Sequence, residues 1–154
     1  GLLPIAPREL SLLAFVAGVA RAREDAVEAK SITLDLKGSQ SLTVSADPRQ
    51  LGRAIGQLLD NAINGTPRGG RILIDIGRKR GETKIVISDN GRGMSQHELA
   101  RALEGIRMSA DGKGIERRHG LGIPLARQLV EAHGGTLEIH SRKNGGTTAS
   151  ITLP

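Results

Sequence analysis

The sequence contains no cysteine, tryptophan or tyrosine, and Phe15 is its single aromatic residue. The lack of cysteine excludes disulfide frameworks, thiol nucleophiles and zinc sites built on cysteine. Because aromatic side chains are almost absent, any hydrophobic core must consist of aliphatic residues. The longest apolar run, Leu12–Ala20, has nine residues, whereas a membrane-spanning helix needs about 20. We therefore expect a globular protein with an aliphatic core.

Positive charge exceeds negative charge: 22 lysines and arginines and 16 aspartates and glutamates give a net charge of +6 over 154 residues. Basic residues cluster only at Arg78–Arg80 and Arg117–Arg118, and no aromatic residues lie among them to stack on bases. We interpret the charge as a solvated surface and expect no binding to nucleic acid. An anionic small ligand such as a nucleotide is the more specific alternative. The length favours one domain.

Hydrophobic periodicity predicts the elements of the first half. Apolar residues at helical spacing predict a helix over residues 7–29, and alternation predicts strands at 32–36 and near 42–44. Asp47 suits the N-cap of the next helix, because Pro48 fits the first helical position and Gln50 the capping-box position. We expect this helix to run to about residue 64.

The second half predicts two hairpins and two helices. One hairpin is expected from alternating runs at 71–77 and 83–88, and another from runs at 136–141 and 147–153, each with a glycine-containing turn. Helices are expected at 95–104 and 122–133. We therefore predict an α+β fold, a two-layer α/β sandwich with one mixed, mostly antiparallel sheet and helices on one face.

Three motifs in this order can carry chemistry. Gln57 and Asn61 lie four residues apart on a predicted helix, so both amides project from one face, where they can ligate Mg²⁺ or bind phosphate oxygens. Asp89–Met94 follows a predicted strand, where a carboxylate can accept from an exocyclic amine and glycines allow close approach to a flat ring. A polar helix stripe and an ordinary glycine turn are the simpler interpretations of these two motifs.

The third motif is Gly120–Pro124. Proline is tolerated only in the first turn of a helix, so Pro124 predicts a helix that begins near Gly122. The free N–H groups at such a helix start bind anions. A glycine-bounded helix start without a ligand is the simpler interpretation.

Taken together, the three motifs resemble the N, G1 and G2 boxes of the GHKL ATPase superfamily. Residues 57–67 are similar to the N box, 89–94 to the G1 box and 120–135 to the G2 box, and 146–154 resemble the closing strand. Within this superfamily, the sequence resembles the catalytic, ATP-binding domain of sensor histidine kinases. Its G2 box resembles that of alphaproteobacterial cell-cycle kinases of the PleC, DivJ and DivL type. The resemblance covers about residues 30–154 and implies the Bergerat-type fold.

The resemblance implies that ATP and Mg²⁺ are the cofactors and gives each matching residue a role. Asn61 becomes the Mg²⁺ ligand and, with Gln57, the catalytic pair, and Asp89 becomes the acceptor for the adenine amino group. Residues 105–119 would form a lid over ATP, and we expect that lid to be mobile without nucleotide. The remaining residues placed near the nucleotide are Asn64, Gly91, Gly93, Met94, Arg118, His119, Gly120, Leu121, Gly122 and Thr148.

The sequence departs from the family pattern at several positions. Gln57 stands where Asn is usual, Asn64 and Gly65 stand where lysine and an aromatic are usual, and Arg118 stands where glycine is common. No F box with its phenylalanine is recognisable in residues 103–109. A degenerate nucleotide-binding or partner-binding pseudokinase is therefore the alternative to a histidine protein kinase, whose activity we expect to be weak. Relatives that hydrolyse ATP directly carry Glu as a general base in place of Gln57, which disfavours a DNA-processing ATPase.

The resemblance also implies domains and partners. Residues 31–154 are expected to form the ATP-binding domain, and residues 1–30 a helical segment that links to an absent dimerisation domain or packs on the core. None of the four histidines has an acceptor context: His97 is expected on the surface, and His133 at a helix end favoured by the dipole. The expected partners are that dimerisation domain, which receives the γ-phosphate, and a response regulator. We expect a cytoplasmic, monomeric domain without membrane contact.

Overall fold

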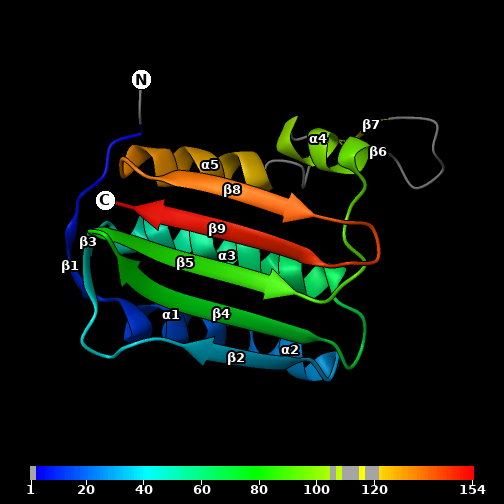
Figure 1. The fold of residues 1–154 in the computed structure, drawn as a ribbon, viewed down its shortest axis with the longest axis horizontal. Helices are drawn as coiled ribbons and strands as arrows, with labels where there is room; N and C mark the ends of the chain where they lie inside the picture. The colour runs from blue at the N-terminus through cyan, green and yellow to red at the C-terminus, as the bar shows by residue number, and fades with distance from the viewer. Residues whose placement is uncertain (1–2, 105–106, 109–114, 117–121) are drawn as a thin grey trace.

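The computed structural model describes residues 3–104, 107–108, 115–116 and 122–154. Its main sheet has five strands in the order β2-β4-β5-β9-β8. β2 runs parallel to β4, and every other neighbouring pair is antiparallel, which confirms the predicted mixed sheet (Figure 1). The strands are β2 (Thr33–Lys37), β4 (Arg71–Lys79), β5 (Glu82–Asp89), β8 (Thr136–Ser141) and β9 (Thr147–Leu153).

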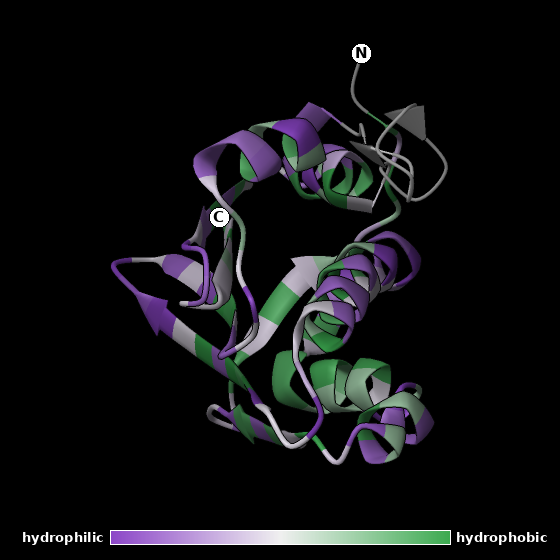
Figure 2. Cartoon of the chain, turned by 90° about the vertical axis from the view of Figure 1, so that its right-hand side faces the viewer, coloured by the Kyte–Doolittle hydropathy of each residue, from purple (hydrophilic) through white to green (hydrophobic). Residues whose placement is uncertain are grey.

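Helices cover one face of this sheet. α3 (Pro48–Gly65) crosses the middle, α5 (Gly122–Ala132) packs beside it, and α1 (Leu12–Arg21) contacts its other side. The shorter helices are α2 (Glu24–Ala29) and α4 (Gln96–Glu104). Figure 2 shows the two layers edge-on, with strands on one side and helices on the other. The predicted two-layer α/β sandwich is confirmed.

Two short strand pairs lie outside the main sheet. β1 (Arg8–Ser11) pairs antiparallel with β3 (Thr43–Ala46), and β6 (Arg107–Met108) pairs with β7 (Ile115–Glu116). The prediction of one helix over residues 7–29 is therefore wrong at its start. β1 forms because β3, distant in sequence, offers it a row of backbone partners, and local periodicity cannot reveal such a partner.

The same segment is also interrupted between α1 and α2. Arg23 stands at the break, where its side chain forms an ion pair with Asp60 of α3 at 2.8 Å and donates to the carbonyl of Val19. Leu12 and Val16 of α1 are fully buried and belong to the same hydrophobic cluster as the rest of the molecule. α1 is thus anchored in the core by these two side chains.

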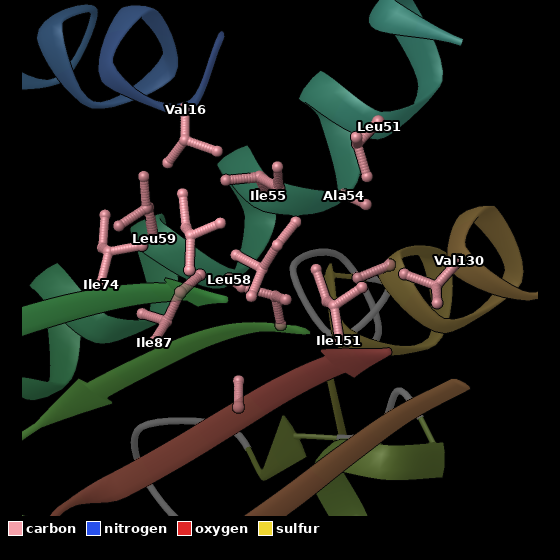
Figure 3. Packing of buried hydrophobic residues seen from close by; sticks show 14 of the residues in the cluster. Val16, Leu51, Ala54, Ile55, Leu58, Leu59, Ile74, Ile87, Val130 and Ile151 are labelled. Atoms are coloured by element: carbon pink, nitrogen blue, oxygen red, sulfur yellow. The ribbon is translucent and has the colours of Figure 1, made fainter. Parts of the chain in front are cut away.

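The core is aliphatic, as the composition predicts. Figure 3 shows side chains of α1, α3 and α5 meeting those of the central strands, with Leu59 near Ile74 and Val130 near Ile151. Full burial of one such side chain contributes about 1.5–3 kcal/mol. Within the described ranges, no helix is both long and apolar enough to cross a membrane.

At the start of α3, the side chain of Asp47 caps the helix as predicted, whereas the N–H of Asp47 has an unpredicted partner. Asp47 Oδ1 accepts from the N–H groups of Arg49 and Gln50 at 3.0 and 3.2 Å, which confirms the N-cap. The capping-box role of Gln50 is wrong, because the N–H of Asp47 donates instead to His133 Nε2. The Gln50 side chain accepts from Arg53 at 3.0 Å. Tertiary packing of α5 against α3 supplies the alternative acceptor.

The predicted turns and helix boundaries agree with the structure elsewhere. Arg80 and Gly81 both have positive φ, at 55° and 81°, as a two-residue hairpin turn of the primed type requires. Pro124 lies in the first turn of α5, and Gly134, at φ 77°, follows its end. The second hairpin has its strands at the predicted residues.

Candidate functional site

The sequence motifs converge at one end of the sandwich, where β5 ends, α3 ends and α5 begins (Figure 1). A pocket at this end has mostly apolar walls and a few polar groups, which is typical of a small-molecule site. Its lining residues are Leu58, Asn61, Ala62, Asn64, Gly65, Ile87, Asp89, Arg92, Gly93, Met94, Ala102, Ile123, Ile139, Thr147 and Ala149.

The amide pair of α3 faces the start of α5. A Cβ atom at Gly122 would lie 3.0 Å from Gln57 Oε1 and 3.9 Å from Asn61 Oδ1. The missing side chain at Gly122 thus lets both amides approach a helix N-terminus, whose first N–H groups have no partner within the helix. The structure therefore brings Gln57, Asn61 and Gly122 together, and Asn61 also lines the pocket.

Asp89, the last residue of β5, is half-buried in the pocket wall. Its Oδ1 accepts from the N–H of Gly91 at 2.8 Å and from the N–H of Thr147 at 3.3 Å. Within the described part of the chain, no hydrogen bond reaches Oδ2. Burial raises the pKa of Asp89, and the two N–H groups oppose that rise. One oxygen is therefore fixed by the protein, and the other can accept from a ligand.

Two glycines of the following loop are required by the chain itself. Gly93 has φ 63°, and a Cβ there would overlap the carbonyl oxygen of Arg142. A Cβ at Gly91 would overlap the carbonyl oxygen of Gly65. Sequence reasoning explained these glycines by close approach to a flat ring, whereas here the neighbouring groups are backbone. Gly93 and Met94 line the pocket, and Gly91 lies in the adjacent groove.

Thr148 is not brought to the pocket. It pairs with Ser88 across the sheet, with its hydroxyl 3.5 Å from Ser88 Oγ, and it lines a separate groove. Thr147 occupies the pocket instead. The alternation of buried residues such as Ala149 and Ile151 already assigns odd positions of β9 to the helix side. The sequence therefore held a signal that selects Thr147 over Thr148.

Other predicted site residues have different outcomes. Asn64 lines the pocket, as expected. Arg118, His119, Gly120 and Leu121 lie outside the described residues, as does most of the expected lid over residues 105–119. Arg92, Ala102 and Ile139 also line the pocket. Arg92 lies within the Asp89–Met94 motif but was given no role from the sequence. No local pattern points to Ala102 and Ile139, because separate elements bring them there.

The three histidines within the described ranges, His97, His133 and His140, do not line this pocket. His97 is exposed, as expected, and so is His140, which lies 3.5 Å from Glu138. His133 stands just after α5, where its Nε2 accepts a hydrogen bond from the N–H of Asp47. Its place at the end of α5 agrees with the prediction, and the hydrogen bond to Asp47 adds a contact that the sequence did not indicate.

A magnesium ion would find few protein ligands here. The described residues contain no group of three or more histidine, aspartate or glutamate side chains that could hold a metal. Mg²⁺ commonly keeps several waters and is bound by one or two protein groups together with substrate phosphates. The amide oxygens of Asn61 and Gln57, next to a helix N-terminus, fit such a sparse ligand set.

Comparison with known proteins identifies the family. The sequence pattern described as Histidine kinase-, DNA gyrase B-, and HSP90-like ATPase matches residues 46–154. Histidine protein kinase DivJ of Caulobacter vibrioides is 36% identical over 113 residues, 73% of this chain and 19% of DivJ. Sensor protein DivL of the same organism is 32% identical over 135 residues, 87% of this chain and 17% of DivL. The chain thus spans less than a fifth of these relatives.

The fold agrees with this relationship. The catalytic domain of histidine kinase ThkA superposes with a TM-score of 0.82 at 20% identity, covering 97% of this chain and 96% of that one. The five-stranded sheet with helices on one face is therefore the fold of that catalytic domain. The chain belongs to the family of histidine kinase-, DNA gyrase B- and HSP90-like ATPases, the GHKL superfamily, as an ATP-binding catalytic domain of the sensor histidine kinase type.

Proposed function

We propose that this chain binds Mg·ATP between α3, β5 and α5 and supplies the γ-phosphate to a residue of a separate dimerisation domain. The observation that carries the proposal is the hydrogen bonding of the Asp89 carboxylate. Its Oδ1 is held by the N–H groups of Gly91 and Thr147, which leaves Oδ2 to accept from the amino group of adenine. Guanine has a carbonyl oxygen at that position and would place acceptor against acceptor.

Phosphoryl transfer depends mainly on positioning the phosphates and neutralising their charge. Asn61, with Gln57 beside it, would hold Mg²⁺, which neutralises phosphate charge when bound. The N–H groups at the start of α5, around Gly122, would receive phosphate oxygens. Gln57 has no useful basicity and cannot act as a general base toward water. This feature favours transfer to a protein acceptor over direct hydrolysis.

The partners follow from the same proposal. None of the four histidines of this chain has the sequence context of a phosphoacceptor, so the acceptor would belong to a dimerisation domain outside these residues. A response regulator would then take the phosphoryl group from that domain. We propose that the domain itself is monomeric and works in the cytoplasm, without contacting a membrane.

A nucleotide-binding or partner-binding pseudokinase is the second candidate. It is favoured by Asn64, which lines the pocket where the family resemblance leads us to expect a lysine. Arg92 is the only cation among the described lining residues, and its side chain is largely exposed. A pocket with little positive charge would bind a nucleotide yet transfer its phosphate slowly.

Two measurements separate these candidates. Calorimetric titration with a non-hydrolysable ATP analogue, with and without Mg²⁺, tests binding. Incubation with radiolabelled ATP and a separately supplied dimerisation domain tests transfer. Binding with transfer supports the kinase, binding without transfer supports the pseudokinase, and absence of binding contradicts the proposal. The chain alone is expected to acquire no acid-labile label, and label on His97 would contradict the expected absence of an acceptor.

A further inference from the structure

The hydroxyl of Ser141, the last residue of β8, contacts three separate groups. Its Oγ accepts from the N–H of Met94 at 2.8 Å, lies 2.7 Å from Thr147 Oγ1 and lies 3.2 Å from the carbonyl oxygen of Gly146. Met94 belongs to the loop after β5, whereas Gly146 and Thr147 stand at the start of β9. One side chain therefore connects the loop that follows Asp89 to the β8–β9 hairpin.

These contacts use the whole hydrogen-bonding capacity of a hydroxyl group, which has one donor and two acceptor sites. All three form together when Ser141 donates to the carbonyl of Gly146 and accepts from the N–H of Met94 and the hydroxyl of Thr147. Ser141 does not line the pocket of Asp89. Any effect of Ser141 on that pocket must therefore pass through its neighbours.

Two of the three neighbours of Ser141 are pocket residues. Met94 and Thr147 both line the pocket, and the N–H of Thr147 donates to Asp89 Oδ1. A backbone hydrogen bond also joins the loop to the hairpin: the N–H of Asn144 donates to the carbonyl of Arg92 at 2.6 Å. The loop thus docks on the hairpin, and Ser141 adds side-chain hydrogen bonds to both partners.

We propose that Ser141 is a positioning residue for the base-binding part of the pocket. It holds Met94 against the hairpin and fixes Thr147, which in turn orients the carboxylate of Asp89. The effect on nucleotide affinity rests on the proposed function, whereas the hydrogen bonds themselves belong to the ligand-free protein. The two ideas can therefore fail separately.

The test compares wild type with Ser141→Ala, which removes the hydroxyl, and Ser141→Thr, which keeps it. Ser150→Ala is the matched control, because Ser150 lies in β9 at a position that alternates away from Thr147 and the pocket. Amide hydrogen exchange at Met94 measures the contact in the ligand-free protein. Calorimetric titration with ADP measures the affinity of the site.

We expect Ser141→Ala to accelerate exchange at Met94 and to weaken ADP binding, each by about threefold to tenfold, because a lost hydrogen bond of this kind has that effect. Ser141→Thr should restore most of both values, and Ser150→Ala should change neither. Rescue by threonine distinguishes a role of the hydroxyl from a general effect of packing.

Three results would overturn the inference: wild-type exchange at Met94 in Ser141→Ala, unchanged ADP affinity in that variant, or a threonine variant that behaves like the alanine variant. If the wild type itself does not bind ADP, the proposed function fails. The exchange of Met94 in the alanine and threonine variants then decides the positioning role alone.

Discussion

His133 Nε2 accepts a hydrogen bond from the backbone N–H of Asp47 at 3.0 Å and so joins the end of α5 to the start of α3. The other ring nitrogen, Nδ1, lies 2.7 Å from the carbonyl oxygen of Leu129 and donates to it. Each nitrogen satisfies a backbone group that a helix terminus leaves without a helical partner. The two hydrogen bonds of His133 hold the end of α5 against the start of α3. The opposite ends of these two helices meet at the pocket.

His133→Ala is expected to lower the free energy of unfolding by about 1–3 kcal/mol, because both backbone groups lose their partner. Urea denaturation measures this change. His140→Ala is the matched control, since His140 is exposed and makes only a distant contact with Glu138. Equal effects of the two substitutions would mean that the Asp47 contact contributes nothing.

Asp89→Asn is expected to weaken binding of adenine nucleotides by about 1.5–3 kcal/mol, tenfold or more, while the fold stays intact. Asparagine keeps an oxygen for the N–H groups of Gly91 and Thr147 but turns an NH₂ group toward the amino group of adenine. Calorimetry checks the affinity, with Asp75→Asn on the exposed side of β4 as control. Unchanged affinity in a folded Asp89→Asn protein would remove Asp89 from the site.

Asp47 and Asp89 have pKa values shifted in opposite directions. The N–H of Ala6 above all, and those of Gln50 and Arg49, lower the pKa of Asp47, whereas burial raises the pKa of Asp89. A lowered native pKa contributes stability above the ordinary value, and that contribution is lost as pH falls through the native value. A raised native pKa contributes stability below the ordinary value, and that contribution is lost as pH rises through the native value.

At neutral pH we therefore expect Asp47→Asn to lower the free energy of unfolding and Asp89→Asn to raise it. Both differences should shrink as the pH falls below the ordinary carboxyl range, because the wild type then also carries neutral groups. Urea denaturation of the wild type, Asp47→Asn and Asp89→Asn, from neutral pH to below the ordinary carboxyl range, measures both effects. Changes of the same sign at neutral pH would show that the pKa shifts do not control stability here.

Thr83→Val is expected to stabilise the protein by about 1 kcal/mol. The Thr83 side chain is fully buried in β5, and its hydroxyl has no hydrogen-bond partner among the residues that the structure describes. Valine has nearly the same shape and removes the buried polar group. Thermal and urea denaturation test this, with Thr136→Val at an exposed position as control. Loss of stability would indicate that a buried water satisfies the hydroxyl.

Asn61→Ala is expected to abolish the enhancement of ATP-analogue binding by Mg²⁺ while leaving adenosine binding nearly unchanged. The reason is that Asn61 lies in the pocket beside Gln57 and the start of α5, where the proposed ligand would place its phosphates. Titrations with both ligands, with and without Mg²⁺, measure the effect. Equal enhancement in wild type and variant would exclude Asn61 as the metal ligand.

Local signals predicted much of the fold. β8 and β9 were expected at 136–141 and 147–153 and lie there, because alternation and a glycine turn are properties of a few neighbouring residues. Pro124 indicated the start of α5 for a similar reason, since proline is tolerated only in the first turn of a helix. The order of the three motifs indicated the family.

The sequence by itself determined the aliphatic core, the hairpins, the helix boundaries set by Pro48 and Pro124, and the pairing of the Gln57 and Asn61 amides on one helix face. Only the tertiary structure decided that residues 8–11 form a strand, that His133 rather than Gln50 serves Asp47, and that Ser141 ties Met94 to Thr147. Periodicity and turn chemistry act between near neighbours, whereas the β1–β3 pairing, the Asp47–His133 bond and the Met94–Ser141 bond join segments that are distant in the sequence and meet only in the folded chain.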